Sequence, residues 1–136
     1  MLSSYLLDTN ILSELVRNPD GIIQKKIAIL LRKSHRVCTS ILVAAESRYG
    51  ILKKESPRLA EQVEQVLAAI DILPFDKDGD LYYARLRLDL ERRGQLIGGT
   101  DMFIAAHALA TRSILVTHNV REFSRISELV VEDWLV

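Results

Sequence analysis

The stretch YLLDTN at residues 5–10 joins a short apolar run to an amphipathic segment, Ile11 to Val16, through a single aspartate. Short apolar runs are typical of buried strands, and apolar residues three or four positions apart are typical of helices. An aspartate between the two lies at the carboxyl end of the strand, which is the edge of an α/β sheet where ligands bind. We therefore expect Asp8 to belong to a functional site.

Strands and helices alternate along the rest of the chain. Apolar runs predict strands at residues 4–8, 37–39, 72–75, 114–117 and 129–131. Helical periodicity predicts helices at residues 11–16, 22–32, 41–50, 57–70, 76–93 and 101–111. Because few residues join these elements, the alternation predicts an α/β fold with a parallel sheet and helices on both of its faces. No repeat or linker interrupts the pattern, so we expect a single domain over residues 1–136.

Polar residues mark the expected helix starts. Ser40 and the pair Ser56-Pro57 have the form of N-caps, and Thr9 or Asn10 is expected to cap the first helix. The helical spacing also predicts a set of side chains that pack inward: Ile23, Ile27, Leu30, Leu31, Ile41, Ala44, Ala45 and Tyr49.

Composition excludes several classes of protein. The 136 residues are 49% hydrophobic and 26% charged, as in globular domains. Lys and Arg together number 18, as do Asp and Glu, so a nucleic-acid partner would have to be held by a local basic surface or through metal ions. The single cysteine, Cys38, excludes an intrachain disulfide and a cysteine-rich zinc site, and its neighbours Val37 and Thr39 predict a buried thiol in a strand.

Hydropathy gives an expectation about location. No apolar run approaches the ~20 residues of a membrane span, so we expect no membrane association. The N-terminal segment has no basic residues and reaches Asp8 too early for a signal peptide. We therefore expect a cytoplasmic protein.

Two further acids occur in settings like that of Asp8. Glu46 lies in the second turn of the helix that follows the next strand, and Asp101 opens a helix, while Asn119 follows the strand at 114–117. Right-handed crossovers bring all four positions to the same edge of a parallel sheet. Carboxylate oxygens are the ligands that Mg²⁺ or Mn²⁺ prefers, and without a cation such packed acids repel and raise a pKa. The sequence therefore predicts a site for a divalent metal, which can activate water and neutralise charge on a phosphodiester.

Each acid also has an ordinary explanation. Asp101 taken alone is more often a helix cap, and Glu46 taken alone is an even choice between a site residue and an exposed helical glutamate. Asp8 is less easily explained in this way, because a buried strand precedes it directly. The combined pattern carries more weight than any single member.

Four segments of the chain carry a family resemblance, and they run from end to end in the family's order: YLLDTNILSE (5–14), TSILVAAESRYG (39–50), IGGTDMFIAAHA (97–108) and ILVTHNVREF (114–123). They resemble the PIN-domain ribonucleases, in particular the VapC-type toxins of type II toxin–antitoxin systems. The tail LVVEDW (129–134) is similar as well. Together these blocks are specific, whereas the tripeptide DTN alone is not.

The resemblance implies a three-layer α/β/α fold around a parallel sheet and an Mg²⁺- or Mn²⁺-dependent endoribonuclease that inhibits translation, with tRNA as one candidate substrate. It also implies a homodimer, a partner VapB-type antitoxin encoded beside the toxin, and DNA contact only through that antitoxin. By position, Asp8, Glu46 and Asp101 would be the catalytic, metal-binding acids. Asn119 stands where many PIN proteins have a fourth acid, which favours one well-held ion over two.

Neighbouring polar residues are candidates for holding carboxylates or waters in place. They are Thr9, Asn10 and Thr117, although Thr9 and Asn10 are equally explained as helix caps and Thr117 as a β-branched strand residue. Two other functions stay open at this point. One is a catalytically silent RNA- or protein-binding regulatory module, and the other is a site in which Asp8 accepts a phosphoryl group.

Overall fold

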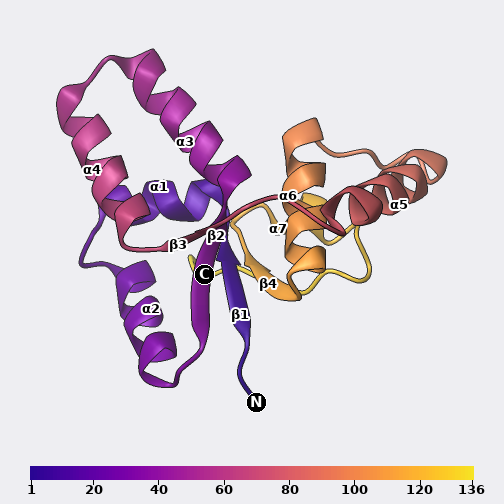
Figure 1. Ribbon diagram of the computed structural model, residues 1–136, viewed down its shortest axis with the longest axis horizontal. Coiled ribbons are helices and arrows are strands. Elements are labelled where there is room, and N and C mark those ends of the chain that lie inside the picture. The colour runs from indigo at the N-terminus through magenta and orange to yellow at the C-terminus, as the bar shows by residue number, and fades with distance from the viewer.

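Five parallel strands form the centre of the computed structural model, which describes residues 1–136 (Figure 1). The strands are β1 (Ser4–Leu7), β2 (Arg36–Ser40), β3 (Asp71–Leu73), β4 (Ser113–Val116) and β5 (Val131–Glu132). Their spatial order is β3-β2-β1-β4-β5, and every neighbouring pair is parallel. The predicted parallel sheet is confirmed, and the predicted strand ends differ from the observed ones by at most two residues.

Seven helices connect and cover these strands. They are α1 (Thr9–Arg17), α2 (Ile22–Arg32), α3 (Ile41–Lys54), α4 (Pro57–Ala68), α5 (Gly79–Arg92), α6 (Gly99–Ala110) and α7 (Val120–Phe123). In Figure 1, α1 to α4 lie on one side of the strands and α5 to α7 on the other, which gives three layers, α/β/α. None of the helices is both long and apolar enough to cross a membrane.

The order of the strands creates a switch point at β1. From β1 the chain first adds β2 and β3 on one side, and then returns to add β4 and β5 on the other side. The backbone N–H of Asp8 donates to the carbonyl of Val116 at 2.9 Å, so the carboxyl ends of β1 and β4 are joined directly. A crevice outside the strand ends at such a switch point is where α/β sheets bind ligands.

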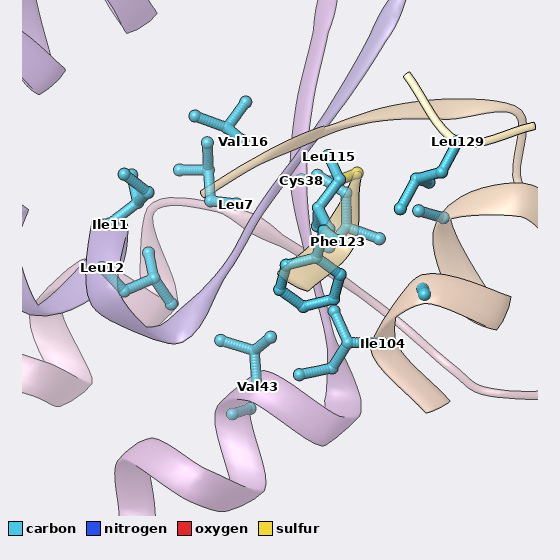
Figure 2. Close-up of a cluster of buried hydrophobic side chains, with 14 of the residues drawn as sticks. Leu7, Ile11, Leu12, Cys38, Val43, Ile104, Leu115, Val116, Phe123 and Leu129 are labelled. Atoms are coloured by element: carbon cyan, nitrogen blue, oxygen red, sulfur yellow. The ribbon is translucent and has the colours of Figure 1, made fainter. Parts of the chain in front are cut away.

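One hydrophobic core holds the layers together (Figure 2). Leu7, Leu115 and Val116 have no exposed surface, because the central strands are covered on both faces. Figure 2 shows Phe123 of α7 packed among these strands and Ile104 of α6. Cys38 is fully buried, as predicted.

Several helix boundaries differ from prediction; for example, α5 begins three residues later than expected and α6 two residues earlier. Asp8 caps α1, with its side chain accepting a hydrogen bond from the N–H of Thr9, so the expected cap at Thr9 or Asn10 is wrong. The helix starting at Ile41 continues to Lys54 and does not end at Gly50; it ends where Glu55 adopts a left-handed φ of 53°. The caps at Ser40 and Ser56 are confirmed.

Several side chains expected to pack inward are exposed. Ile41, Ala45, Tyr49 and Leu31 lie at the surface, and Leu30 is half-buried. The reason is visible for α3, which leaves the sheet alongside α4 (Figure 1), so that only its early residues Val43 and Ala44 are buried. The short helix α7 carries too few residues to show helical periodicity, and sequence patterns did not predict it.

Candidate metal centre

Asp8 is a buried residue at the carboxyl end of β1, with only 4% of its surface exposed. Its Oδ1 accepts a hydrogen bond from the N–H of Thr9 at 2.8 Å, and its Oδ2 accepts one from the Thr117 hydroxyl at 2.8 Å. Burial raises the pKa of Asp8, and the negative charge of Glu46 raises it further, while the two hydrogen bonds act in the opposite direction. The net effect is a raised pKa, so burial outweighs the hydrogen bonds.

Glu46 lies in α3, one turn beyond the helix start, and faces the beginning of α1. The hydroxyl of Thr9 donates to its Oε1 at 2.7 Å. Thr9 therefore contacts both acids, because its N–H binds Asp8 and its hydroxyl binds Glu46. This residue fixes the two carboxylates relative to each other.

Asp101 lies in the first turn of α6, three residues after Gly98, and no hydrogen bond reaches its carboxylate. Burial raises its pKa to about 6, with further contributions from the negative charges of Asp8, Glu46 and Glu122. The backbone comes close to this group, since a Cβ at Gly98 would lie 3.4 Å from Asp101 Oδ2. Asp101 is thus a partly buried acid whose negative charge lacks a compensating partner.

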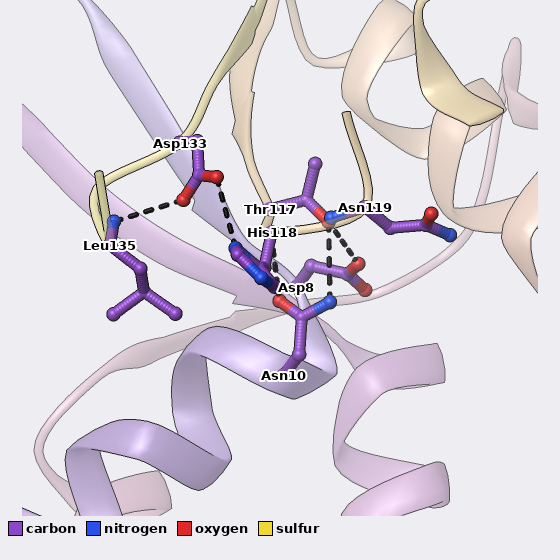
Figure 3. Close-up of polar contacts among 7 residues, drawn as sticks. All are labelled: Asp8, Asn10, Thr117, His118, Asn119, Asp133 and Leu135. Carbon is purple, nitrogen blue, oxygen red and sulfur yellow. Dashed lines mark hydrogen bonds and ion pairs between the residues drawn. The ribbon is translucent and has the colours of Figure 1, made fainter. Parts of the chain in front are cut away.

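A network of polar groups supports the Asp8 side of the site (Figure 3). The Thr117 hydroxyl, which donates to Asp8, accepts from the N–H of Asn119 at 3.0 Å and makes a long contact of 3.5 Å with the Asn10 amide. Asn10 in turn accepts from the N–H of His118 at 3.1 Å. The Asn119 amide makes no hydrogen bond itself, so it is available to a water or a ligand.

The structure therefore brings the three predicted acids to one rim. Asp8, Glu46 and Asp101 come from three separate helix starts, yet they lie close enough for Asp101 to be affected by the charges of both others. Their roles as metal ligands stay a prediction. Thr9, Asn10 and Thr117 lie within the same network, whereas the Asn119 side chain stands at its edge.

Sequence reasoning missed Glu122. This acid belongs to α7 and adds to the negative potential at Asp101. The signal available in the sequence was the spacing from Asn119 to Glu122, which is three residues and therefore about one helical turn. Without a predicted helix at 120–123, this spacing had no structural meaning.

The residues present fit a hydrated divalent cation. The donors are carboxylate oxygens with a nearby amide, which is the hard-ligand set that suits Mg²⁺ or Mn²⁺. No three His, Cys, Asp or Glu side chains meet closely enough to enclose an ion by direct contact. Because Mg²⁺ keeps several waters and is held through one or two carboxylates, this open arrangement suits it better than Zn²⁺, which takes a closed set of ligands in structural sites.

A groove begins beside the acids and runs between α1, α3 and α4. It has a volume of about 310 Å³ and is lined at one end by Thr9 and Glu46. Apolar side chains such as Val16 and Val63 line it further along, and Lys54 is also part of its wall. The groove therefore combines a carboxylate end with an apolar floor.

Comparisons with known proteins agree on one family. The PIN domain family matches residues 5–129. Ribonuclease VapC2 of Rickettsia felis is 36% identical over 132 residues, covering 96% of this chain and 97% of that protein. The tRNA(fMet)-specific endonuclease VapC of Shigella flexneri is 31% identical over 131 residues, covering 96% and 97%. The crystal structure of VapBC2 from Rickettsia felis, bound to a DNA fragment from its promoter, contains a chain with a TM-score of 0.90 and 34% identity, covering 96% of this chain and 98% of that one.

Proposed function

This chain belongs to the PIN-domain family and is of the VapC type, and from this premise we propose that it is a metal-dependent endoribonuclease that acts as the toxin of a toxin–antitoxin pair. The observation that supports this most directly is the acidic rim at the switch point of the sheet. Asp101 has a pKa raised to about 6 by burial and by Asp8, Glu46 and Glu122, so the rim favours a positive charge. Both relatives compared above are named as nucleases that act on RNA.

In the proposed mechanism Asp8, Glu46 and Asp101 would together hold one hydrated Mg²⁺ or Mn²⁺, with one or two of the carboxylates binding the ion directly and the rest of the rim binding it through its waters. The bound ion would supply an activated water and neutralise charge on the scissile phosphodiester. The Thr117 hydroxyl keeps the Asp8 carboxylate oriented, and the Thr9 hydroxyl does the same for Glu46. The free Asn119 amide would orient a water at the edge of the rim. No histidine, cysteine or serine nucleophile is needed.

The substrate we propose is structured RNA, with tRNA as the first candidate to test. This choice rests on the relative from Shigella flexneri, which is named as tRNA(fMet)-specific. The net charge of the chain is zero, so RNA binding has to depend on local cationic groups and on the metal site. Arg48 is less suited to this role, because its guanidinium forms two hydrogen bonds with Glu64 at 3.0 Å.

We propose a VapB-type antitoxin as partner and a homodimer as the assembly, and DNA contact through the antitoxin alone. The related structure from Rickettsia felis is a VapBC complex on promoter DNA. The groove between α1, α3 and α4 supports a protein partner, because an apolar segment laid along Val16 and Val63 would end beside Glu46. Such a partner could block the acids directly.

The test is cleavage of RNA by the purified protein without its partner. We expect cleavage with Mg²⁺ or Mn²⁺, loss on chelation, and a loss of at least about 100-fold in Asp8→Asn and Asp101→Asn, since each removes a charge that holds the ion. Asp80→Asn is the matched control, because Asp80 also lies in the first turn of a helix but is exposed on α5. Full cleavage by both rim variants would refute the assignment.

RNA cleavage tests one of the two other functions, and a phosphorylation assay tests the other. A regulatory module would bind RNA without cutting it under any metal condition. A phosphoacceptor would yield a phosphorylated Asp8, but this carboxylate is buried and both of its oxygens accept hydrogen bonds, which makes it a poor nucleophile. Mass spectrometry of the intact protein after incubation with a phosphoryl donor would detect such an adduct.

A further inference from the structure

A buried hydrogen bond joins the two helices that carry Glu46 and Asp101. His107 of α6 is 2% exposed, and its Nδ1 lies 2.6 Å from the Ser40 hydroxyl oxygen. Ser40 is fully buried and caps α3, with its oxygen accepting from the N–H of Leu42 at 3.0 Å. Glu46 follows Ser40 by six residues, and His107 follows Asp101 by six residues.

The donors in this contact can be assigned. The Ser40 oxygen already accepts the N–H of Leu42, so its own hydrogen is free to point at His107. Because the Pro74 carbonyl is the group nearest the other side of the ring, the tautomer with its proton on Nε2 suits both sides, and Nδ1 then accepts the Ser40 hydrogen. Burial lowers the pKa of His107, which favours this neutral form.

Burying the Nε2 side of the His107 ring costs stability. Nε2 of His107 is the one buried side-chain nitrogen or oxygen without a hydrogen bond of good geometry, and its only acceptor nearby is the poorly aligned carbonyl of Pro74. The Phe75 ring packs edge-on at 5.4 Å. An apolar residue of similar shape would avoid this cost, since a buried polar group with a weak partner is less stable there than in water. Packing alone therefore does not explain a histidine here.

The surroundings make the hydrogen bond the directional element of the α3–α6 contact. On the α6 side the neighbouring buried residues are Ile104, Ala105 and Ala106, and on the α3 side they are Val43 and Ala44. Such apolar contacts allow two helices to slide by fractions of an ångström, whereas a short hydrogen bond fixes both distance and orientation.

We propose that His107 is a positioning residue: by holding Ser40, it fixes the helix that carries Glu46 against the helix that carries Asp101, and so sets the affinity of the rim for a divalent cation. This inference rests on the proposed function, because it assumes that these acids bind a metal. His107 itself lies in the core behind the rim, where it contacts no ligand.

Mn²⁺ binding to the full chain, measured by calorimetry, tests the proposal without relying on cleavage. We expect His107→Phe, which keeps the ring volume and removes the hydrogen bond, to weaken Mn²⁺ binding on the order of 10-fold, as for other groups that orient ligands indirectly. His107→Asn keeps an acceptor near the Nδ1 position and should bind Mn²⁺ nearly as the parent protein does. In cleavage, His107→Phe should need more Mn²⁺ for half-maximal rate but reach a similar rate at saturation.

Ser40→Ala and Ser56→Ala form a second, matched pair. Both remove a serine that caps a helix, since Ser56 accepts from the N–H of Leu59 at 3.2 Å, but only Ser40 contacts His107. We expect Ser40→Ala to weaken Mn²⁺ binding as much as His107→Phe does, and Ser56→Ala to leave it unchanged. This pair decides the question if His107→Phe does not fold.

The outcomes distinguish a failure of the positioning role of His107 from a failure of the metal site itself. Parent-like Mn²⁺ affinity in folded His107→Phe, or equal effects of Ser40→Ala and Ser56→Ala, would overturn the positioning role alone. If the parent protein binds no Mn²⁺, or if Asp101→Asn binds it equally well, the metal site itself is wrong and the positioning role with it.

Discussion

The amino ends of α1 and α6 each bring an aspartate to the same rim, but the two carboxylates are held in opposite ways. Asp8 is almost fully buried and accepts hydrogen bonds from Thr9 and Thr117. Asp101 is half-buried and accepts none. For both groups burial is the largest cause of a raised pKa, but only at Asp8 do hydrogen bonds act against it.

This difference separates a preorganised carboxylate from one that needs a counter-ion. Hydrogen bonds to a carboxylate stabilise its charged form in place, so Asp8 is positioned whether or not a metal is present. The carboxylate of Asp101 is repelled by the three neighbouring negative charges of Asp8, Glu46 and Glu122. A cation bound between these acids would neutralise the repulsion and attract all of them. The comparison leads to four predictions.

The largest expected effect is on metal affinity when the support of Asp8 is removed. Thr117→Val takes away the hydroxyl that donates to Asp8 and accepts from Asn119, at a fully buried position. We expect Mn²⁺ affinity to fall on the order of 10- to 100-fold, as is typical when a partner of a metal ligand is lost. Calorimetric titration measures this directly.

Thr39→Val is the control for that variant. Thr39, in β2, is also a fully buried threonine, but its hydroxyl donates to the carbonyl of Leu7 at 2.7 Å and contacts no carboxylate. Equal losses of Mn²⁺ affinity in the two variants would mean that Asp8 is not specifically supported by Thr117.

The second prediction concerns stability of the metal-free protein. Asp8→Ala removes the cap of α1 and leaves the buried Thr117 hydroxyl without its acceptor. We expect the free energy of unfolding to fall on the order of 1 kcal/mol, because the lost cap and the unsatisfied buried hydroxyl outweigh the gain from removing a carboxylate whose pKa is raised by burial. Denaturant unfolding measures the change, and an unaltered midpoint would show that Asp8 has no structural role.

The third prediction is a gain in stability of the metal-free protein. Asp101→Asn removes a charge that burial and three neighbouring acids disfavour, so the metal-free protein should become more stable by on the order of 1 kcal/mol, or about 3 °C in Tm. The gain should be complete above pH 6, where Asp101 is charged in both folded and unfolded states. It should shrink as the pH falls from about 6 toward 3.8, because only the folded protein takes up a proton in that interval.

Thermal unfolding with and without Mn²⁺ completes this test. Added Mn²⁺ should raise the Tm of the parent protein and should have little effect on Asp101→Asn. A lower Tm for Asp101→Asn without metal at pH 7.5 would contradict the idea that Asp101 lacks compensation.

The contrast between the two aspartates also shows which features sequence patterns can predict. The sheet and its rim follow from apolar runs, short connections and the handedness of the crossovers, so Asp8 and Asp101 could be assigned to one edge. The hydrogen bond from Thr9 to Glu46 could not be predicted, because it depends on how α3 is packed against α1. The exposure of Tyr49 was missed for a related reason, since α3 departs from the sheet.

The smallest expected effect comes from Glu122, the most weakly contributing of the three acids that raise the pKa of Asp101. Glu122→Gln should move that pKa from about 6 toward its ordinary value of 3.8, but only by a small part of the interval, because burial and the charges of Asp8 and Glu46 persist. NMR titration of the aspartate side-chain carboxyl carbons in metal-free protein measures this, with Glu128→Gln as an exposed control. A pKa restored fully toward 3.8 would mean that α7, which sequence patterns did not predict, controls the charge of the rim more than Asp8 and Glu46 do.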